Sequence, residues 1–117
     1  MRKRIIEEKS LAFGIRIINM TKYLKEKDTD RNILSQISRS GTSIGANIAE
    51  GSYSQSNADY ITKHQIALKE ANETSYWLSL LYKTKSLSEA EYCSINDDLI
   101  EIIKILTSIL KTSKGIS

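Results

Sequence analysis

The side chains that most often do chemistry are scarce in this sequence. His64 is the only histidine and Cys93 the only cysteine, so a zinc site, which needs several such ligands, is not expected. A carboxylate-bridged metal site in a helical bundle requires a Glu three residues before a His, but that position holds Ile61. A serine nucleophile needs a nearby base, and His64 falls on a predicted core face. The sequence therefore predicts that the protein is not an enzyme and uses no metal or other cofactor.

The most unusual stretch is polar and lies inside a helical pattern. Residues 38–51 read SRSGTSIGANIAEG. At about 100° per residue, one stripe is apolar apart from a glycine, the pattern of a buried seam: Ile33, Ile37, Gly41, Ile44 and Ile48. The neighbouring stripe is polar throughout: Gln36, Ser40, Ser43, Asn47 and Glu50. Such a stripe is a solvated flank, a set of bonds to a neighbouring helix, or a contact surface. Three members of this stripe, together with Arg39 beside it, make the candidate functional surface: Arg39, Ser43, Asn47 and Glu50.

Three glycines punctuate this helix. Gly41 and Gly45 should each cost about 1 kcal/mol relative to Ala in a helix interior. A helix that tolerates both is expected to be approached closely there by another backbone or side chain. Gly51 is expected to end the helix in the left-handed conformation that glycine adopts readily.

The first and third predicted helices each carry more apolar side chains than one core face requires. The first helix has a core stripe, Ile6, Phe13, Ile17, Met20 and Leu24, and a second one on nearly the opposite side, Leu11, Ile15 and Ile18. That second stripe is either buried within the bundle or meets another subunit. The outer side of the third helix carries Ile66, Glu70, Glu73, Trp77 and Leu80. Large rings are favoured in protein interfaces, so this set is the candidate subunit interface, although its acids also suit a solvated helix.

These patterns place the candidate residues on four helices. The first runs from about Arg4 to Lys25, the second follows an N-cap at Asp30 and ends at Gly51, and the third spans about Ala58 to Lys83. A capping box of Ser88 and Glu91 opens the fourth. Short polar loops make antiparallel neighbours, and no segment alternates like a strand. We predict an all-α, up-down-up-down antiparallel four-helix bundle that forms a single domain over residues 1–117.

Composition limits the location and the partners. No apolar run is long enough for a membrane span or a signal peptide, and a lone cysteine suits a reducing compartment, so a cytoplasmic protein is expected. The net charge is +3, but residues 1–40 hold 10 Lys or Arg against 5 Asp or Glu. This basic first third is either a solvated helix face or a surface for nucleic acid.

Two segments resemble a known family. The stretch 38–51 and the later run ALKEANETSYWLSLL at 67–81 are similar to the four-helix-bundle proteins encoded in intervening sequences of 23S ribosomal RNA genes. The resemblance implies a ring-shaped homo-oligomer, usually a pentamer, with no established catalytic activity. A distant relative, the accessory protein of diversity-generating retroelements, binds nucleic acid. The family's Phe-Pro pair before the second helix and its Arg in the loop after it are absent here, so no role is carried over to that loop.

The resulting hypothesis is a non-catalytic, self-assembling bundle whose main partner is a further copy of itself. The alternative is an RNA- or DNA-binding accessory factor whose basic surface is gathered by oligomerisation.

Overall fold

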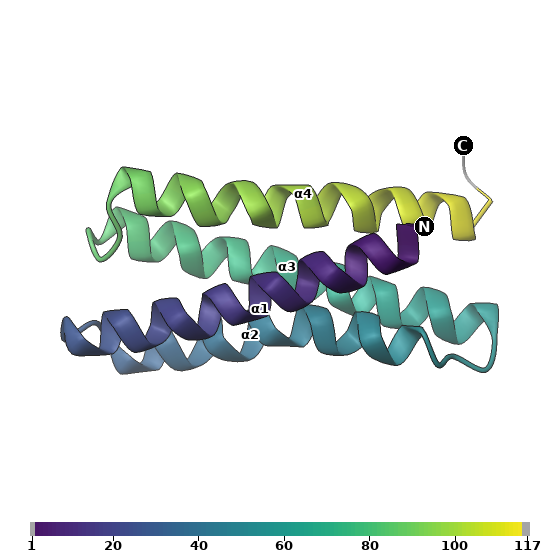
Figure 1. Cartoon of the computed structure of the whole chain (residues 1–117), viewed down its shortest axis with the longest axis horizontal. Coiled ribbons are helices and arrows are strands. Elements are labelled where there is room, and N and C mark those ends of the chain that lie inside the picture. Colours follow the sequence, from purple (N-terminus) through teal and green to yellow (C-terminus); the bar gives the residue numbers. More distant parts are fainter. Residues whose placement is uncertain (1, 116–117) are drawn as a thin grey trace.

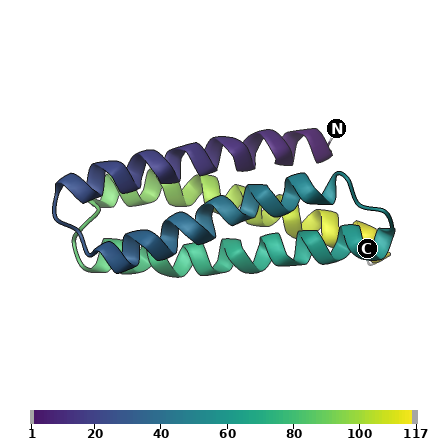
Figure 2. The same cartoon turned by 90° about the horizontal axis from the view of Figure 1, so that it is seen from below.

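The structure is a computed structural model that describes residues 2–115, with side chains from residue 4 onward. It contains four α-helices: α1 Arg2–Glu26, α2 Arg31–Gly51, α3 Asn57–Lys83 and α4 Glu89–Ser113. The chain reverses at each of the three short connections (Figures 1 and 2), so consecutive helices lie antiparallel. The predicted all-α four-helix bundle is confirmed, within an envelope of 45 × 24 × 20 Å.

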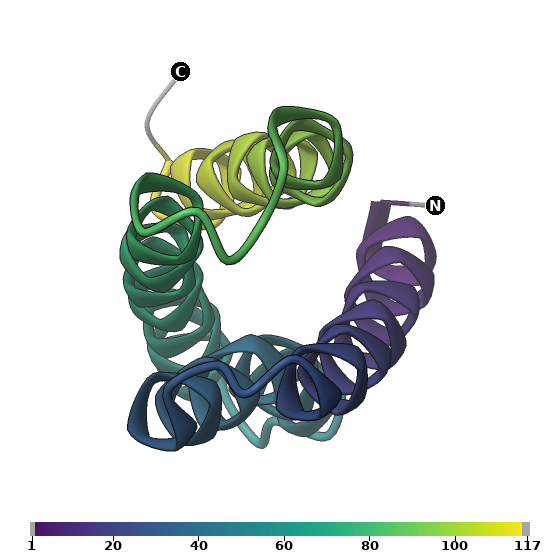
Figure 3. The same ribbon diagram turned by 90° about the vertical axis from the view of Figure 1, so that its left-hand side faces the viewer.

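Each helix packs against two others. α2 contacts α1 and α3, and α4 contacts α3 and α1. Viewed end-on in Figure 3, α1 and α3 stand across the bundle from each other. Their outer faces therefore look in different directions, which matters for the two surplus apolar surfaces predicted from the sequence.

Side-chain caps determine where the helices begin. The carboxylate of Asp30 accepts a hydrogen bond from the backbone N–H of Ile33 at 3.0 Å, and Ser56 caps α3 through the N–H of Asp59. Ser88 and Glu91 form the predicted reciprocal capping box at the start of α4. Each bond satisfies a backbone donor that has no partner inside its helix.

The interior is continuous and almost wholly aliphatic. Its largest fully buried side chains come from every helix: Ile6, Phe13, Ile17, Leu24, Leu34, Ile37, Ile44, Ile48, Leu78, Leu81, Leu99 and Ile102. His64, also buried, donates from Nδ1 to the carbonyl oxygen of Tyr60 at 2.8 Å, so it is a hydrogen-bonded core residue. None of the helices described within residues 2–115 is both long and apolar enough to cross a lipid bilayer.

Helix α1 buries only one of its two apolar stripes. Leu11, Ile15 and Ile18 are 67, 53 and 41% exposed. The interpretation that both stripes are buried within the bundle is therefore wrong, because α2 and α4 cover only one side of α1.

The glycines of α2 lie where neighbouring helices come closest. A Cβ added at Gly41 would stand 2.9 Å from Cγ1 of Ile17, and one at Gly45 would stand 3.3 Å from the carbonyl oxygen of Ser10. The close approach predicted at both positions is confirmed.

The prediction for Gly51 is wrong. Gly51 is a helical residue, its φ is not positive, and Ser52 follows as the C-cap with φ −65°. A Cβ at Gly51 would lie 2.7 Å from Cε1 of His64. The glycine is needed because α3 is close, and not because the backbone turns left-handed.

Candidate functional site

The polar stripe of α2 faces α3 along much of its length. Ser40 is fully buried, and its hydroxyl lies 2.9 Å from that of Thr74 in a hydrogen bond between the helices. At the other end, the carboxylate of Glu50 accepts from Nζ of Lys63 at 2.9 Å. The stripe is therefore not simply a solvated flank, since two of its five members, Ser40 and Glu50, bond to α3.

The middle of the stripe bonds within its own helix. Ser43 donates from Oγ to the carbonyl oxygen of Arg39 at 2.6 Å, and Asn47 donates from Nδ2 to that of Ser43 at 2.8 Å. These groups are half-buried, and their donors already have partners. A ligand-binding role for Ser43, Asn47 and Glu50 stays a prediction, and it would require exchange of these internal bonds.

Arg39 joins the two sets of residues that the sequence placed on separate surfaces. Its guanidinium donates to Oε1 of Glu70 at 3.1 Å and also to Glu73. The indole N–H of Trp77 donates to the same Glu73 carboxylate at 3.0 Å. Arg39, Glu70, Glu73 and Trp77 thus form one cluster, the arginine cluster, across the α2–α3 seam.

The members of the arginine cluster stabilise one another's charged forms. The hydrogen bond from Trp77, followed by that from Arg39, lowers the pKa of Glu73 below its ordinary value. The bonds to Glu73 and then to Glu70 raise the pKa of the Arg39 guanidinium. Both groups are held in their charged forms, as in a charge-assisted pair. The cluster bridges α2 and α3 through these bonds.

The candidate subunit interface on α3 is less open than the sequence suggested. The side chain of Glu70 is only 17% exposed, and Trp77 packs against the core as a partly buried residue. Ile66 and the neighbouring Tyr76 remain exposed. The outer face of α3 therefore offers a small apolar area beside an internal ion pair. Its role in assembly stays a prediction.

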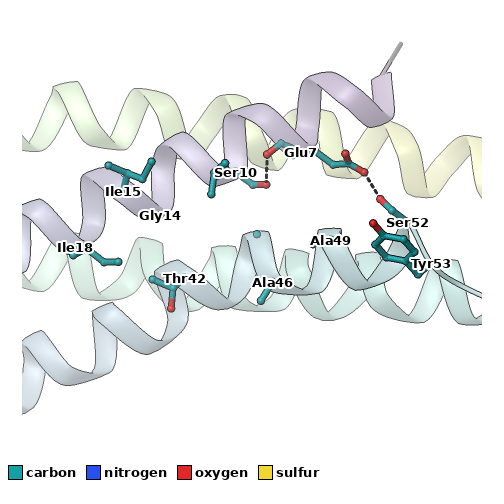
Figure 4. Close-up of a pocket in the computed structure, with 12 residues that line it drawn as sticks. Glu7, Ser10, Gly14, Ile15, Ile18, Thr42, Ala46, Ala49, Ser52 and Tyr53 are labelled. Atoms are coloured by element: carbon teal, nitrogen blue, oxygen red, sulfur yellow. Dashed lines mark hydrogen bonds between the residues drawn. The ribbon is translucent and has the colours of Figure 1, made fainter.

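An apolar groove lies between α1 and α2. Figure 4 shows the exposed stripe of α1 facing small residues of α2 across it. The groove has a volume of about 440 Å³, and its walls include Leu11, Gly14, Ile15, Ile18, Thr42, Gly45, Ala46 and Ala49. Glu7 and Ser52 close one end through a hydrogen bond, and the exposed ring of Tyr53 stands at that rim. We call this feature the α1–α2 groove.

Sequence reasoning found one wall of this groove and missed the other. The stripe of α1 was visible as a second apolar face. The α2 wall consists of Ala46, Ala49 and Gly45, whose small side chains give little hydrophobic signal. Only the interhelical packing shows that they lie opposite the stripe.

The described residues contain little that is typical of an active site. No group of three or more His, Cys, Asp or Glu within them could hold a metal ion. Cys93 is exposed and not in a disulfide. His64 is enclosed in the core, and its ring lies tilted against that of Tyr60, with ring centroids 4.1 Å apart. The geometry defines a small helical bundle with an apolar groove on its surface.

The comparisons with known proteins agree with that class. The chain belongs to the family of the 23S rRNA-intervening sequence protein, whose family model matches residues 2–108. It is similar to the crystal structure of a protein of unknown function from the S23 ribosomal protein family of Bacteroides thetaiotaomicron VPI-5482. The two are 50% identical, with a TM-score of 0.92 over 95% of this chain and 99% of that one. The search of curated proteins found no match.

Proposed function

We propose that this protein is a non-catalytic, self-assembling module that binds further copies of itself to form a ring. The single observation that carries the proposal is the α1–α2 groove. Its α1 wall exposes three large aliphatic side chains that a solvated bundle gains nothing by displaying. Full burial of a wholly exposed side chain of this size is worth about 1.5 to 3 kcal/mol, and these three, which are 41 to 67% exposed, would gain roughly half of that each.

The shape of the groove suits a helix of another copy. Gly14, Gly45, Ala46 and Ala49 leave room between the two walls, and small residues let a partner's backbone come close. A helix laid along the groove would cover the stripe of α1 and meet Tyr53 at the rim. Tyrosine is favoured at such edges because its ring is apolar and its hydroxyl can remain in water.

The position of the groove supports a ring. The groove lies beside α1, while the exposed Ile66 and Tyr76 lie on α3, across the bundle. A contact between two unlike faces is head-to-tail, and repeats of it form a ring when the rotation between copies closes and an open filament when it does not. We propose that the α1–α2 groove of one copy receives the outer face of α3 of the next. The number five comes from the family resemblance.

A charge placed in the groove tests the proposal. Ile18→Glu puts a carboxylate on the apolar wall, where burial without a partner is costly. We expect it to raise the dissociation constant of the oligomer by more than about 10-fold, with helix content unchanged. Mass measured by light scattering over a dilution series would report the shift.

The chain offers a matched control for this variant. Ile100 on α4 is 41% exposed, the same fraction as Ile18, but it does not line the groove. Ile100→Glu should leave the oligomer intact. If both substitutions dissociate it equally, or neither does, the groove is not the subunit contact.

A further inference from the structure

A second pocket, lined by charged and hydroxyl side chains beside Leu34, lies at the end of the bundle where α1 turns into α2. Its volume is about 500 Å³. It adjoins the α1–α2 groove, because Thr42 lines both. Three cations and several hydroxyls surround it: Lys25, Arg31, Arg39, Ser35, Ser38 and Thr42. Among its lining residues there is no carboxylate, and we call it the cationic pocket.

Two of the three cations form no ion pair with a carboxylate of the described residues. Within residues 2–115, neither Lys25 nor Arg31 forms an ion pair. Asp30, next to Arg31 in sequence, uses its side chain to cap α2 through the N–H of Ile33. The lining residues themselves therefore carry only positive charge, and Asp30 lies outside the lining, on the cap of α2.

The third cation is fixed in position. Glu70 on α3 accepts a hydrogen bond from Arg39, and the arginine cluster holds its guanidinium at the α2–α3 seam. Half of the Arg39 side chain remains exposed at the pocket. Glu70 and Glu73 already engage both terminal nitrogens of Arg39. The positive charge available to an anion therefore comes from Lys25 and Arg31.

The hydroxyls add neutral donors. Thr42 donates from Oγ1 to the carbonyl oxygen of Ser38 at 2.7 Å. The hydroxyls of Ser35 and Ser38 have no hydrogen-bond partner within the described residues, although Ser38 is half-buried. Each offers an O–H group one helical turn apart on α2, on the wall that Arg31 and Arg39 share.

We infer that the cationic pocket binds a phosphate group. Lys25 and Arg31 neutralise its charge, and Ser35 and Ser38 donate to its oxygens, a combination of charged and neutral donors suited to phosphate. The pocket volume falls within the range of small-ligand sites, about 300 to 1,000 Å³. A free nucleotide and an RNA strand both present this group, and the experiment separates them.

The test titrates three probes into the full chain: inorganic phosphate, AMP and a single-stranded RNA oligonucleotide. Binding is followed by amide NMR shifts at about 50 mM salt, where phosphate contacts are strong. We expect shifts at Ser35 and Ser38. The double variant Lys25→Ala/Arg31→Ala should weaken binding at least about 10-fold, because it removes two charge-assisted bonds. Ser35→Ala/Ser38→Ala, which changes no charge, should weaken binding about threefold.

The control removes the same charge elsewhere. Lys104→Ala/Lys111→Ala removes two exposed cations of α4 that do not line the pocket, and it should change binding by less than about twofold. RNA that binds tighter than AMP with a steep salt dependence identifies nucleic acid as the ligand, and equal affinity identifies a nucleotide. The inference would be overturned if Lys25→Ala/Arg31→Ala and Lys104→Ala/Lys111→Ala lowered the binding affinity equally, or if none of the probes bound.

Discussion

Replacing Gly41 with Ala adds one methyl group where α1 and α2 come closest. The new Cβ would stand 2.9 Å from Cγ1, 3.0 Å from Cγ2 and 3.3 Å from Cβ of Ile17. Ile17 is fully buried, and its β-branched side chain has one strongly preferred rotamer in a helix. Neither side chain can yield, so the two helices must move apart.

Two opposing terms decide the result. Gly→Ala in a helix interior gains about 1 kcal/mol in helix propensity, while overpacking a close-packed core costs about 1 to 3 kcal/mol. Gly41→Ala should therefore range from neutral to about 2 kcal/mol destabilising. Gly14→Ala is the matched comparison within one chain, because no atom of the chain lies within 4 Å of its added Cβ. Both variants are compared in the Ile18→Glu background, where the proposed groove contact is broken. Gly14→Ala should retain the gain in helix propensity. The free energies of unfolding of the two variants should therefore differ by about 1 to 3 kcal/mol.

Urea denaturation followed by circular dichroism measures the difference, at one protein concentration because oligomers gain apparent stability with concentration. The background Ile17→Ala removes the clashing atoms, and Gly41→Ala should then be stabilising. If Gly41→Ala stabilises the Ile18→Glu protein as much as Gly14→Ala does, close approach does not explain this glycine.

Three further outcomes follow from contacts at other positions. Gly51→Ala should destabilise the fold by about 1 to 3 kcal/mol, because its Cβ would meet the buried ring of His64; thermal unfolding would show whether the parent is the more stable. Ser88→Ala should cost about 0.5 to 2 kcal/mol through the lost capping box, and an unchanged free energy of unfolding would show that the cap contributes nothing. Glu73 has a pKa below its ordinary 4.5, so its stabilising effect is present above about pH 4.5 and is lost as pH falls through the lowered pKa. Arg39→Ala should flatten the acid limb of the stability profile, and an acid limb as steep as the parent's would refute that assignment.

The fold was predictable because its signals are local. Helix caps such as Asp30 and Ser88 and the spacing of apolar residues depend on neighbours a few positions away. The same patterns indicated correctly that Gly41 and Gly45 pack closely, since two glycines inside a helix need a reason. The prediction for Gly51 was wrong because a glycine at a helix end is usually a left-handed cap. The proximity of His64 depends on how α3 packs against α2, which the local sequence does not show.

The arrangement of the candidate site was less predictable. A helical wheel gives the angle of Arg39 on its own helix but not the residues opposite it on the next. The wheel therefore assigned Arg39 and Glu73 to different surfaces, whereas the antiparallel register of α2 and α3 brings them together. Thr74 was missed for a similar reason: it is a polar residue at a core position, and its partner Ser40 lies on another helix.

The α1–α2 groove shows the same limit for apolar surface. The sequence revealed that α1 has one stripe more than it needs, but it did not show whether that stripe is covered. Its exposure depends on where α4 packs, and α4 covers the other side of α1. What covers the stripe in solution is the central question about this protein.

The mass of the unmodified chain in solution answers that question most directly. Light scattering coupled to size exclusion, repeated over a dilution series, gives the mass independently of shape. The proposed ring predicts five times the chain mass of 13.2 kDa, constant down to micromolar concentration. A mass of one chain throughout that range would contradict self-assembly and leave the groove without its proposed occupant.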